Sequence, residues 1–564
     1  MALSEQEIIR REKLETLKSL GINPYPADLF PVNCTSKQAK DAFEDGKKVI
    51  LAGRIMSDRD MGKASFVELQ DSEGRIQLYF NRDVLCPDED KSLYTQVFKK
   101  LTDLGDFIGI EGEMFLTKVG EKSIRVTSFK LLSKTLRPLP LPKIDEDGTV
   151  HDAFNDAELR YRMRYVDLVV NPHVKEVFIK RTKLFTAMRD FFNKNGYMEV
   201  ETPVLQAIAG GAAARPFVTH HNSLDIPLYM RIANELYLKR LIVGGFDGVY
   251  EFSKNFRNEG MDRTHNPEFT AMEIYVAYKD YNWMMNFTEN LLENCAMAVN
   301  GTTDAVFGEH KVSFKAPYHR VTMTDSIKHF TGFDISGKTE NELFEAAKSM
   351  GIEVNETMGK GKLIDEIFGA KCEGNYIQPT FITDYPLEMS PLTKVHRNDP
   401  NLTERFELMV CGKEIANAYS ELNDPIDQRK RFEDQLKLSE KGDDEATQFI
   451  DEDFLRALEF GMPPTSGLGI GMDRLMMFLT NNPSIQEVLF FPQMKPEAKP
   501  LEISEEAKIV LEILKQNNGK MVLEELKVKS NLSGKKWDAA TKGLSKTGLI
   551  KISLIDENKI IEIL

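Results

Sequence analysis

The stretch FRNEGMDRTHNPEFTAMEIYVAY, residues 256–278, contains the pattern that decides the fold. Its second half alternates as a half-buried strand does, with one mixed face and one apolar face. The two faces are Phe269, Ala271, Glu273 and Tyr275 against Met272, Ile274 and Val276. An isolated buried carboxylate is costly, so Glu273 requires a cation or strong donors beside it. A carboxylate at a strand end that is open to water is the alternative.

An upstream segment, FFNKNGYMEVETPVL (residues 191–205), predicts an element boundary. An amphipathic helix that begins near Lys175 ends at Asn195 and Gly196, and a strand then leads to Pro203. Taken alone, this segment is an ordinary helix-to-strand joint.

A downstream segment, ERFELMVCGKEIANAYSEL (residues 404–422), predicts a hairpin that turns at Cys411 and Gly412. Pairing across this turn brings Glu407 near Glu414, and two carboxylates can hold a magnesium ion that also binds phosphates. Glu414 has the opposite strand parity to Glu421, so a bulge is needed before both can face one pocket. Asn417, Tyr419 and Glu421 share a face.

The segment SGLGIGMDRL (residues 466–475) is rich in glycine but matches neither the dinucleotide fingerprint nor the phosphate-loop pattern. It places Asp473 and Arg474 at the start of a helix. Close approach of the backbone to a ligand is one reason for glycine at such positions.

Residues 49–135 predict an OB-fold barrel, with five strands and a helix near Tyr94–Thr102 between the third and fourth strands. Phe66, Gln77 and Tyr79 fall on the polar face of this barrel. Aromatic rings among amides and charges suit single-stranded bases, which stack on rings. A solubilised sheet face with incidental aromatics is the other interpretation.

The remaining regions give an α+β organisation. Residues 1–48 form an N-terminal helical segment, and residues 136–495 form one large domain with a helical insertion near 281–371. Residues 503–564 predict a small winged-helix-like module of three helices and two strands. Two proline-rich linkers separate these regions: LRPLPLPK (residues 136–143) follows the barrel, and KPEAKPLE (residues 495–502) precedes the C-terminal module.

Composition excludes several classes of protein. A net charge of -15 argues against a general electrostatic grip on nucleic acid, so any RNA contact is local. Arg10, Arg11, Lys13 and Lys18 form either one such patch or a solvated helix face. The five cysteines are scattered singly, so no structural zinc is expected. Without a membrane span or signal peptide, we expect a cytoplasmic protein.

In this order and spacing, the segments resemble the signature motifs of class II aminoacyl-tRNA synthetases, most closely the lysyl branch of subclass IIb. The resemblance covers about residues 1–495 and includes GRIMSDRDMGKASFVELQD in the barrel. It implies an antiparallel sheet flanked by helices, and a homodimer formed partly through the segment at Pro203. It also implies ATP-dependent activation of L-lysine to lysyl-adenylate, followed by transfer to the 3' end of tRNA(Lys).

The resemblance also implies roles for individual residues. Arg257 and Arg474 would be catalytic and would bind ATP together with Glu259, His265, Asn266 and Phe269. Phe269 would stack on adenine against Arg474. Glu407 and Glu414 would bind Mg²⁺. The lysine site would consist of Gly211, Glu235, Glu273, Tyr275, Asn417 and Glu421, and the anticodon contacts would be Arg59, Phe66 and Gln77.

Two departures and two rivals limit this interpretation. Thr264 stands where many relatives have a basic residue, and the C-terminal module extends beyond the usual bacterial form. The related ligase that lysylates translation elongation factor P lacks the barrel. The presence of residues 49–132 therefore favours tRNA, not a protein, as the acceptor of lysine. A catalytically silent RNA-binding protein would have lost some of Arg257, Glu407, Glu414 and Arg474, yet all four are present.

Overall fold

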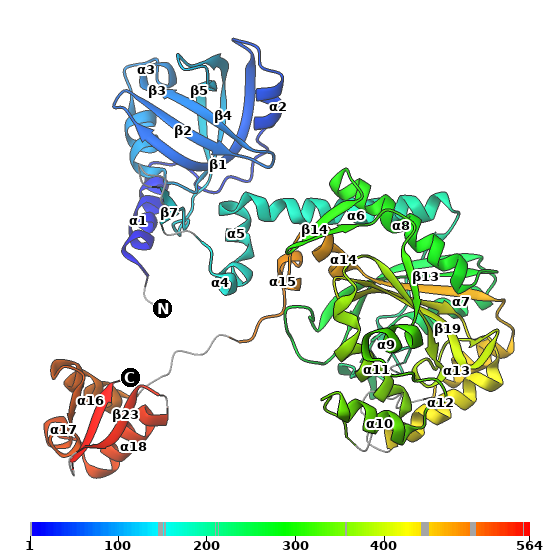
Figure 1. The fold of residues 1–564 in the computed structure, drawn as a ribbon. Helices are drawn as coiled ribbons and strands as arrows, with labels where there is room; N and C mark the ends of the chain where they lie inside the picture. Colours follow the sequence, from blue (N-terminus) through cyan, green and yellow to red (C-terminus); the bar gives the residue numbers. More distant parts are fainter. Residues whose placement is uncertain are drawn as a thin grey trace. The chain divides into compact units, whose positions relative to one another are not determined.

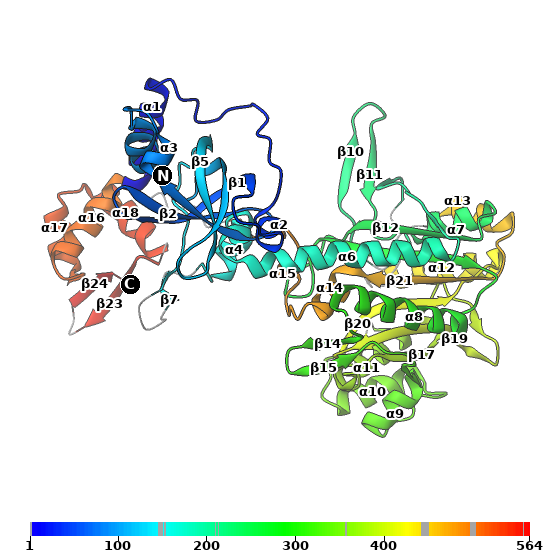
Figure 2. The same ribbon diagram turned by 90° about the horizontal axis from the view of Figure 1, so that it is seen from above.

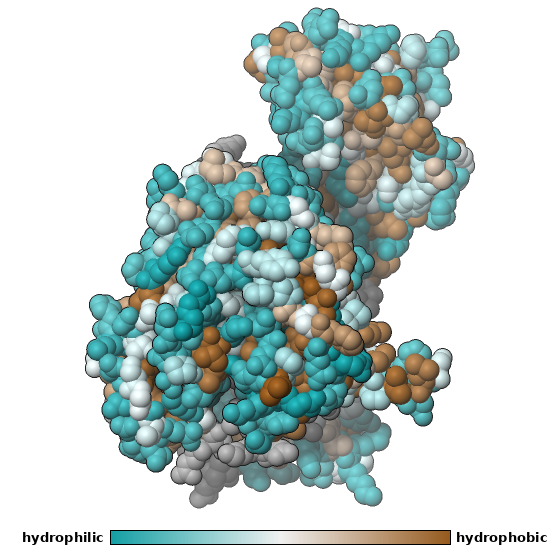
Figure 3. All heavy atoms as spheres, turned by 90° about the vertical axis from the view of Figure 1, so that its right-hand side faces the viewer, coloured by the Kyte–Doolittle hydropathy of each residue, from teal (hydrophilic) through white to brown (hydrophobic). Residues whose placement is uncertain are grey.

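The computed structural model describes residues 3–144, 150–151, 154–208, 210–212, 214–355, 358–440, 450–496, 504–546, 548–555 and 558–563. The chain divides into two compact units, residues 1–492 and 493–564 (Figure 1). Within the described ranges no helix has both the length and the apolar character that crossing a bilayer requires. On the face shown in Figure 3 hydrophilic residues predominate, and apolar residues form small, separate groups.

A closed barrel with strand order β1-β2-β3-β5-β4 confirms the predicted OB-fold. Its strands are β1 (Lys48–Asp60), β2 (Ala64–Gln70), β3 (Arg75–Asn81), β4 (Phe107–Leu116) and β5 (Lys122–Ser133). In β3 the side chains of Ile76, Leu78 and Phe80 fill the interior, whereas Gln77 and Tyr79 between them stay partly exposed. Between β3 and β4 lie α3 (Arg82–Leu85) and a π-helix, η1 (Leu93–Leu101).

The N-terminal segment contains α1 (Glu5–Ser19) and α2 (Ser36–Asp41), each begun by a capping box. Arg10 is buried and donates to the carbonyls of Leu104 and Thr135, and Lys13 forms a 2.6 Å ion pair with Asp103. For Arg10, both the expected RNA-binding patch and the solvated face are therefore wrong. These contacts join α1 to the barrel.

The large domain is built on a mixed sheet with strand order β16-β17-β19-β20-β21-β13-β12-β8, antiparallel except at its two outer pairs. The strands are β8 (Met198–Glu199), β12 (Gly248–Phe256), β13 (Glu268–Ala277), β16 (His319–Thr322), β17 (Thr380–Pro386), β19 (Asp399–Val410), β20 (Lys413–Ser420) and β21 (Thr465–Gly471). The segments singled out in the sequence supply β13, the hairpin β19–β20 and β21, which are neighbours at the centre of this sheet.

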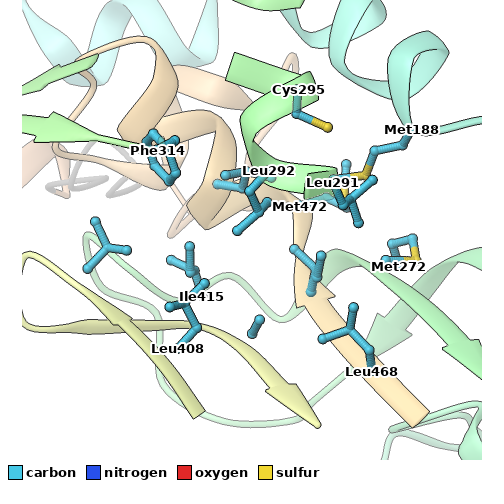
Figure 4. Packing of buried hydrophobic residues seen from close by; sticks show 14 of the residues in the cluster. Met188, Met272, Leu291, Leu292, Cys295, Phe314, Leu408, Ile415, Leu468 and Met472 are labelled. Carbon is cyan, nitrogen blue, oxygen red and sulfur yellow. The ribbon is translucent and has the colours of Figure 1, made fainter. Parts of the chain in front are cut away.

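One face of the sheet is covered by three helices that form the main core. They are α6 (Pro172–Lys194), α8 (Tyr281–Asn300) and α14 (Met472–Leu479), and Figure 2 shows α6 running alongside α8. Figure 4 shows Met272, Leu408 and Leu468 from the strands beneath Leu291 and Met472 from the helices. Because side chains alternate along a strand, the other face of β13 is left for the remaining side chains of the pattern.

The opposite side of the domain carries two further groups of helices. The first is α7 (Glu235–Val243), α12 (Pro425–Glu440) and α13 (Glu452–Glu459); the second is α9 (Met323–Thr331), α10 (Glu340–Ser349) and α11 (Lys360–Lys371), which has a core of its own. The predicted helical insertion, near 281–371, was therefore placed too early in the chain. Its first helix, α8, packs in the central core, and β16 joins the main sheet.

Short elements complete the unit. They are α4 (Ala157–Arg162), α5 (Arg164–Val170), α15 (Ile485–Val488), β6 (Lys143–Ile144), β7 (Val150–His151), β9 (Leu205–Gln206), β10 (Val218–His221), β11 (Ile226–Met230), β14 (Asp304–Phe307), β15 (His310–Ser313), β18 (Val395–His396), η2 (Glu373–Asn375) and η3 (Leu387–Met389).

The C-terminal unit has its own hydrophobic core around Val510, Leu526, Trp537 and Ile561. Its elements are α16 (Glu505–Gln516), β22 (Lys520–Val522), α17 (Leu523–Ser530), α18 (Gly534–Lys546), β23 (Ile550–Ile555) and β24 (Asn558–Ile563). The helices and the last two strands were predicted from the sequence, whereas β22, which pairs with β24, was not. With it, the order matches a winged helix.

Candidate active site

A cavity of about 1060 Å³ lies against the face of the sheet that the core helices leave free. Every catalytic, ATP, lysine and metal residue predicted from the sequence lines it: Gly211, Glu235, Arg257, Glu259, His265, Asn266, Phe269, Glu273, Tyr275, Glu407, Glu414, Asn417, Glu421 and Arg474. The cavity thus brings together residues from four separate segments of the chain.

Glu273 lies in the middle of β13 and is 9% exposed, so the strand-end alternative is wrong. The Tyr275 hydroxyl donates to its carboxylate at 3.0 Å. Burial, together with the negative charge of Glu235, raises the pKa of Glu273 to about 8. The side chain is therefore mostly protonated at neutral pH, and a cation beside it would favour the carboxylate form.

Glu235 and Glu421 share a cation that the sequence analysis missed. Lys239, one turn after Glu235 on α7, is fully buried and lies 2.5 Å from a Glu235 oxygen and in ion-pair contact with Glu421. Burial lowers the pKa of Lys239, but the two carboxylates outweigh this effect and the pKa lies above its usual value. The spacing of four residues on a helix was the signal that could have revealed the pair.

A β-bulge in residues 404–422 explains how Glu414 and Glu421 can face one pocket despite their opposite strand parity. Met409 pairs with Glu414 and Leu408 pairs with Ala416, so Ile415 is an extra residue in β20. The turn itself has positive φ at Cys411 (47°) and Gly412 (66°), as a tight two-residue hairpin turn requires. Because of the bulge, Glu414 lines the same cavity as Glu421.

Arg405 lines the cavity and was not predicted from the sequence. Its guanidinium donates to Glu407 at 2.5 Å and to the Asn417 side chain at 3.1 Å, and it lies 4.5 Å from the Tyr385 ring centroid. It stands two residues before Glu407, so the parity of β19 could have placed it on the same face.

At the other end of the cavity lie the predicted ATP residues. Arg257 lies over the Phe269 ring at 5.1 Å, and burial lowers the pKa of Arg257. Arg474 donates to the Glu414 carbonyl at 2.9 Å and contacts the His265 ring nitrogen Nε2 at 3.2 Å. Thus Arg257 contacts Phe269, whereas Arg474 contacts Glu414 and His265.

Asp473 fixes the start of α14. It accepts a hydrogen bond from the Thr270 backbone at 2.8 Å and pairs with Arg181 at 2.7 Å. Arg474, which lines the cavity, therefore directly follows a buried residue whose side chain is held by two contacts.

The glycines of β21 admit the acidic side chains. A methyl group on Gly467 would overlap the Tyr275 ring and the Glu421 carboxylate, whereas one on Gly469 would only touch Glu273 at an ordinary 3.8 Å. Glycine at 467 is therefore a packing requirement of the pocket.

On the barrel, Phe66, Tyr79 and Phe115 form a row of rings with centroids 5.1 and 5.9 Å apart. Gln77 accepts a hydrogen bond from Ser123, and Arg59 is exposed opposite Phe66 in the β1–β2 pair. The three predicted anticodon residues lie on neighbouring strands. Phe115 was not predicted.

A family model described as tRNA synthetases class II (D, K and N) matches residues 156–495. The chain belongs to this family. The class II synthetase also matches the OB-fold nucleic acid binding domain over residues 49–132.

Among curated relatives of this class II synthetase, the lysine–tRNA ligase of Christiangramia forsetii is 74% identical and covers 98% of this chain and 96% of its own length. The lysine–tRNA ligase of Porphyromonas gingivalis is 68% identical over 88% of this chain and 86% of its own length. That of Azobacteroides pseudotrichonymphae is 66% identical over 88% of this chain and 99% of its own length.

Proposed function

We infer that this class II synthetase activates lysine with ATP and attaches it to transfer RNA. The observation that carries the inference is one cavity that is lined both by buried acidic side chains and by arginines. Glu273 and Glu421 suit an ammonium ion, and Arg257 and Arg474 suit phosphates. The relatives are lysine–tRNA ligases over nearly the whole chain, which supports the same substrate pair.

The first step requires little proton transfer. The carboxylate of lysine is already ionised and attacks the α-phosphorus in line, while pyrophosphate leaves. Arg257 would stabilise charge at the α-phosphate, Arg474 would hold the far phosphates, and Phe269 would stack on adenine. Glu259, His265 and Asn266 would help to position the nucleotide. We propose no general base.

At the acidic end, the amino acid would be held at both amines. Glu235 and Gly211 would bind the α-amino group with Asn417 nearby, and Glu273, Tyr275 and Glu421 would bind the side-chain ammonium. Phe269 and Glu273 are four residues apart on one strand, about 13 Å at ~3.3 Å per residue, so β13 reaches both substrates.

Glu407 and Glu414 fit a magnesium site. No group of three metal-binding side chains occurs in the described ranges, but Mg²⁺ usually takes one or two carboxylates plus substrate phosphates. Burial and the charge of Glu414 raise the pKa of Glu407 to about 7, although the Arg405 guanidinium opposes this shift. When bound, the ion would neutralise charge on the phosphates.

The barrel would recognise the anticodon of tRNA(Lys). Phe66 offers a ring for a base to stack on, and Arg59 and Gln77 offer donors for its edge. The acceptor end would receive the lysyl group at the 3'-hydroxyl.

A homodimer would form partly through the segment at Pro203. Met198, Val204 and Leu205 on this segment are exposed apolar side chains in a single chain. Sedimentation equilibrium at micromolar concentration is expected to give twice the chain mass, and a monomer would contradict this proposal.

Exchange of pyrophosphate into ATP across all twenty amino acids tests the function. Lysine is expected to support exchange, and tRNA with radiolabelled lysine is expected to become charged. Exchange without charging would favour the rival ligase that modifies a protein. No exchange with any amino acid would favour a silent RNA-binding protein and overturn the inference.

A further inference from the structure

Lys239 lies behind the amino-acid pocket and is absent from its lining. Its side chain has no exposed surface, and it projects from α7 between Glu235 and Glu421. The aromatic rings of Tyr419 and Phe454 flank its ammonium at 5.5 and 5.9 Å. A lysine enclosed in this way does not contact the substrate, so its effect must be exerted through the two carboxylates.

The two carboxylates that share Lys239 come from different elements and have different proposed tasks. Glu235 is the first residue of α7, and Glu421 directly follows β20. Under the proposed function, Glu235 binds the α-amino group and Glu421 binds the side-chain ammonium. One internal cation therefore fixes the spacing between the acids that bind the two ends of the substrate.

Each acid keeps an oxygen for the ligand. Glu235 Oε1 accepts hydrogen bonds from both Lys239 and the Tyr419 hydroxyl (2.7 Å), while no donor among the described residues reaches its other oxygen. Among the described residues, Oε1 of the fully buried Glu421 has no hydrogen-bond donor. A buried carboxylate oxygen without a donor is costly, so it requires a ligand that supplies one.

We propose that Lys239 is a positioning residue that sets the length of the amino-acid tail this pocket accepts. The bridge Glu235–Lys239–Glu421 would hold the two acids at the separation that suits four methylene groups. It would disfavour ornithine, whose tail is one methylene group shorter. This inference rests on the proposed activation of lysine.

The test compares Lys239→Met and Lys239→Arg with the wild-type chain in pyrophosphate exchange, using lysine and ornithine. For Lys239→Met we expect kcat/KM for lysine to fall at least tenfold, mainly through KM, because the two acids lose their common cation. The preference for lysine over ornithine should fall at least fivefold, and the KM for ATP should stay unchanged. Lys239→Arg keeps the charge but changes its shape, so the same preference should shift while the melting temperature is maintained.

Arg164→Met is the matched control, because Arg164 is a fully buried cation paired with Asp167 and does not line the cavity. It should lower stability without changing the preference for lysine over ornithine. If Lys239→Met does not fold, the preference of Lys239→Arg decides. Equal losses for lysine and ornithine, or an unchanged preference in Lys239→Arg, would overturn the inference. Absence of lysine-dependent exchange in the wild type would instead refute the proposed function.

Discussion

Glu273 is a carboxylic acid where a core strand normally has an apolar side chain. Its position opposite Met272 and Ile274 follows from strand alternation, so the sequence alone predicts that it needs a partner. The structure supplies the Tyr275 hydroxyl and no direct cation among the described residues, and the pKa of Glu273 rises to about 8. The missing charge is the one that a substrate ammonium would bring.

Lysine binding should therefore release a proton. At pH 7 the side chain of Glu273 is mostly protonated, and an ammonium ion stabilises the carboxylate form. We expect release of about one proton per lysine at pH 7, declining toward zero above pH 9. Calorimetric titration of lysine in phosphate and in Tris measures this release as a difference in observed heat. Glu273→Gln should abolish the difference, and equal heats for the wild type would contradict the prediction.

The same residue should reduce stability at alkaline pH. The folded-state pKa of about 8 lies above the ordinary value of 4.5, so the folded state binds more protons between these values. Stability is therefore undiminished below pH 4.5 and falls as pH rises to 8. Glu273→Gln should be more stable than the wild type at pH 9 by a few kcal/mol, and within about 1 kcal/mol of it at pH 5.

Thermal unfolding of both proteins at the two pH values measures this effect. Glu268→Gln, on the exposed end of the same strand, is the control and should show no such dependence. A constant offset between Glu273→Gln and the wild type at both pH values would refute the effect.

At the scale of elements, β21 crosses the cavity as a strand without side chains at three of its seven positions. Gly467→Ala should lower kcat/KM for lysine by roughly 5- to 150-fold, because overpacking costs about 1–3 kcal/mol. The KM for ATP should stay unchanged. Gly469→Ala is the matched control, since its methyl group meets nothing closer than 3.8 Å. Equal effects of the two variants in pyrophosphate exchange would contradict the packing argument.

Helices and strands with a clear hydrophobic periodicity were predictable from the sequence. How these elements pair and pack with one another was only partly predictable. The parity of β13 and the turn at Gly412 follow from local pattern and turn chemistry. The bulge at Ile415 does not, because an apolar residue fits either a regular strand or a bulge. Lys239 was likewise hidden, because its second partner, Glu421, lies far along the chain. Helix α8 was assigned to an insertion since apolar periodicity does not say which core a helix joins.

At the scale of the whole molecule, we expect the barrel to bind tRNA and the large domain to activate lysine. Phe66→Ala should raise the KM for tRNA by roughly 5- to 150-fold, because stacking on a ring contributes about 1–3 kcal/mol per base. Lysine-dependent exchange without tRNA should be unchanged, since Phe66 is not among the residues that line the cavity. Val119→Ala, an exposed side chain in the turn between β4 and β5, is the control. An equal loss in exchange and charging would refute this division.

The C-terminal module is expected to be dispensable for charging. It has its own core, the residues lining the cavity end at Ile485, and the family match ends at residue 495. The Azobacteroides relative is matched over 99% of its length by 88% of this chain, so a lysine–tRNA ligase exists without a counterpart to the remainder. A chain of residues 1–495 should charge tRNA with kcat/KM within about twofold of the full chain, an energy difference below about 0.5 kcal/mol. A loss of tenfold or more through the KM for tRNA, with exchange unchanged, would instead assign the module to tRNA binding.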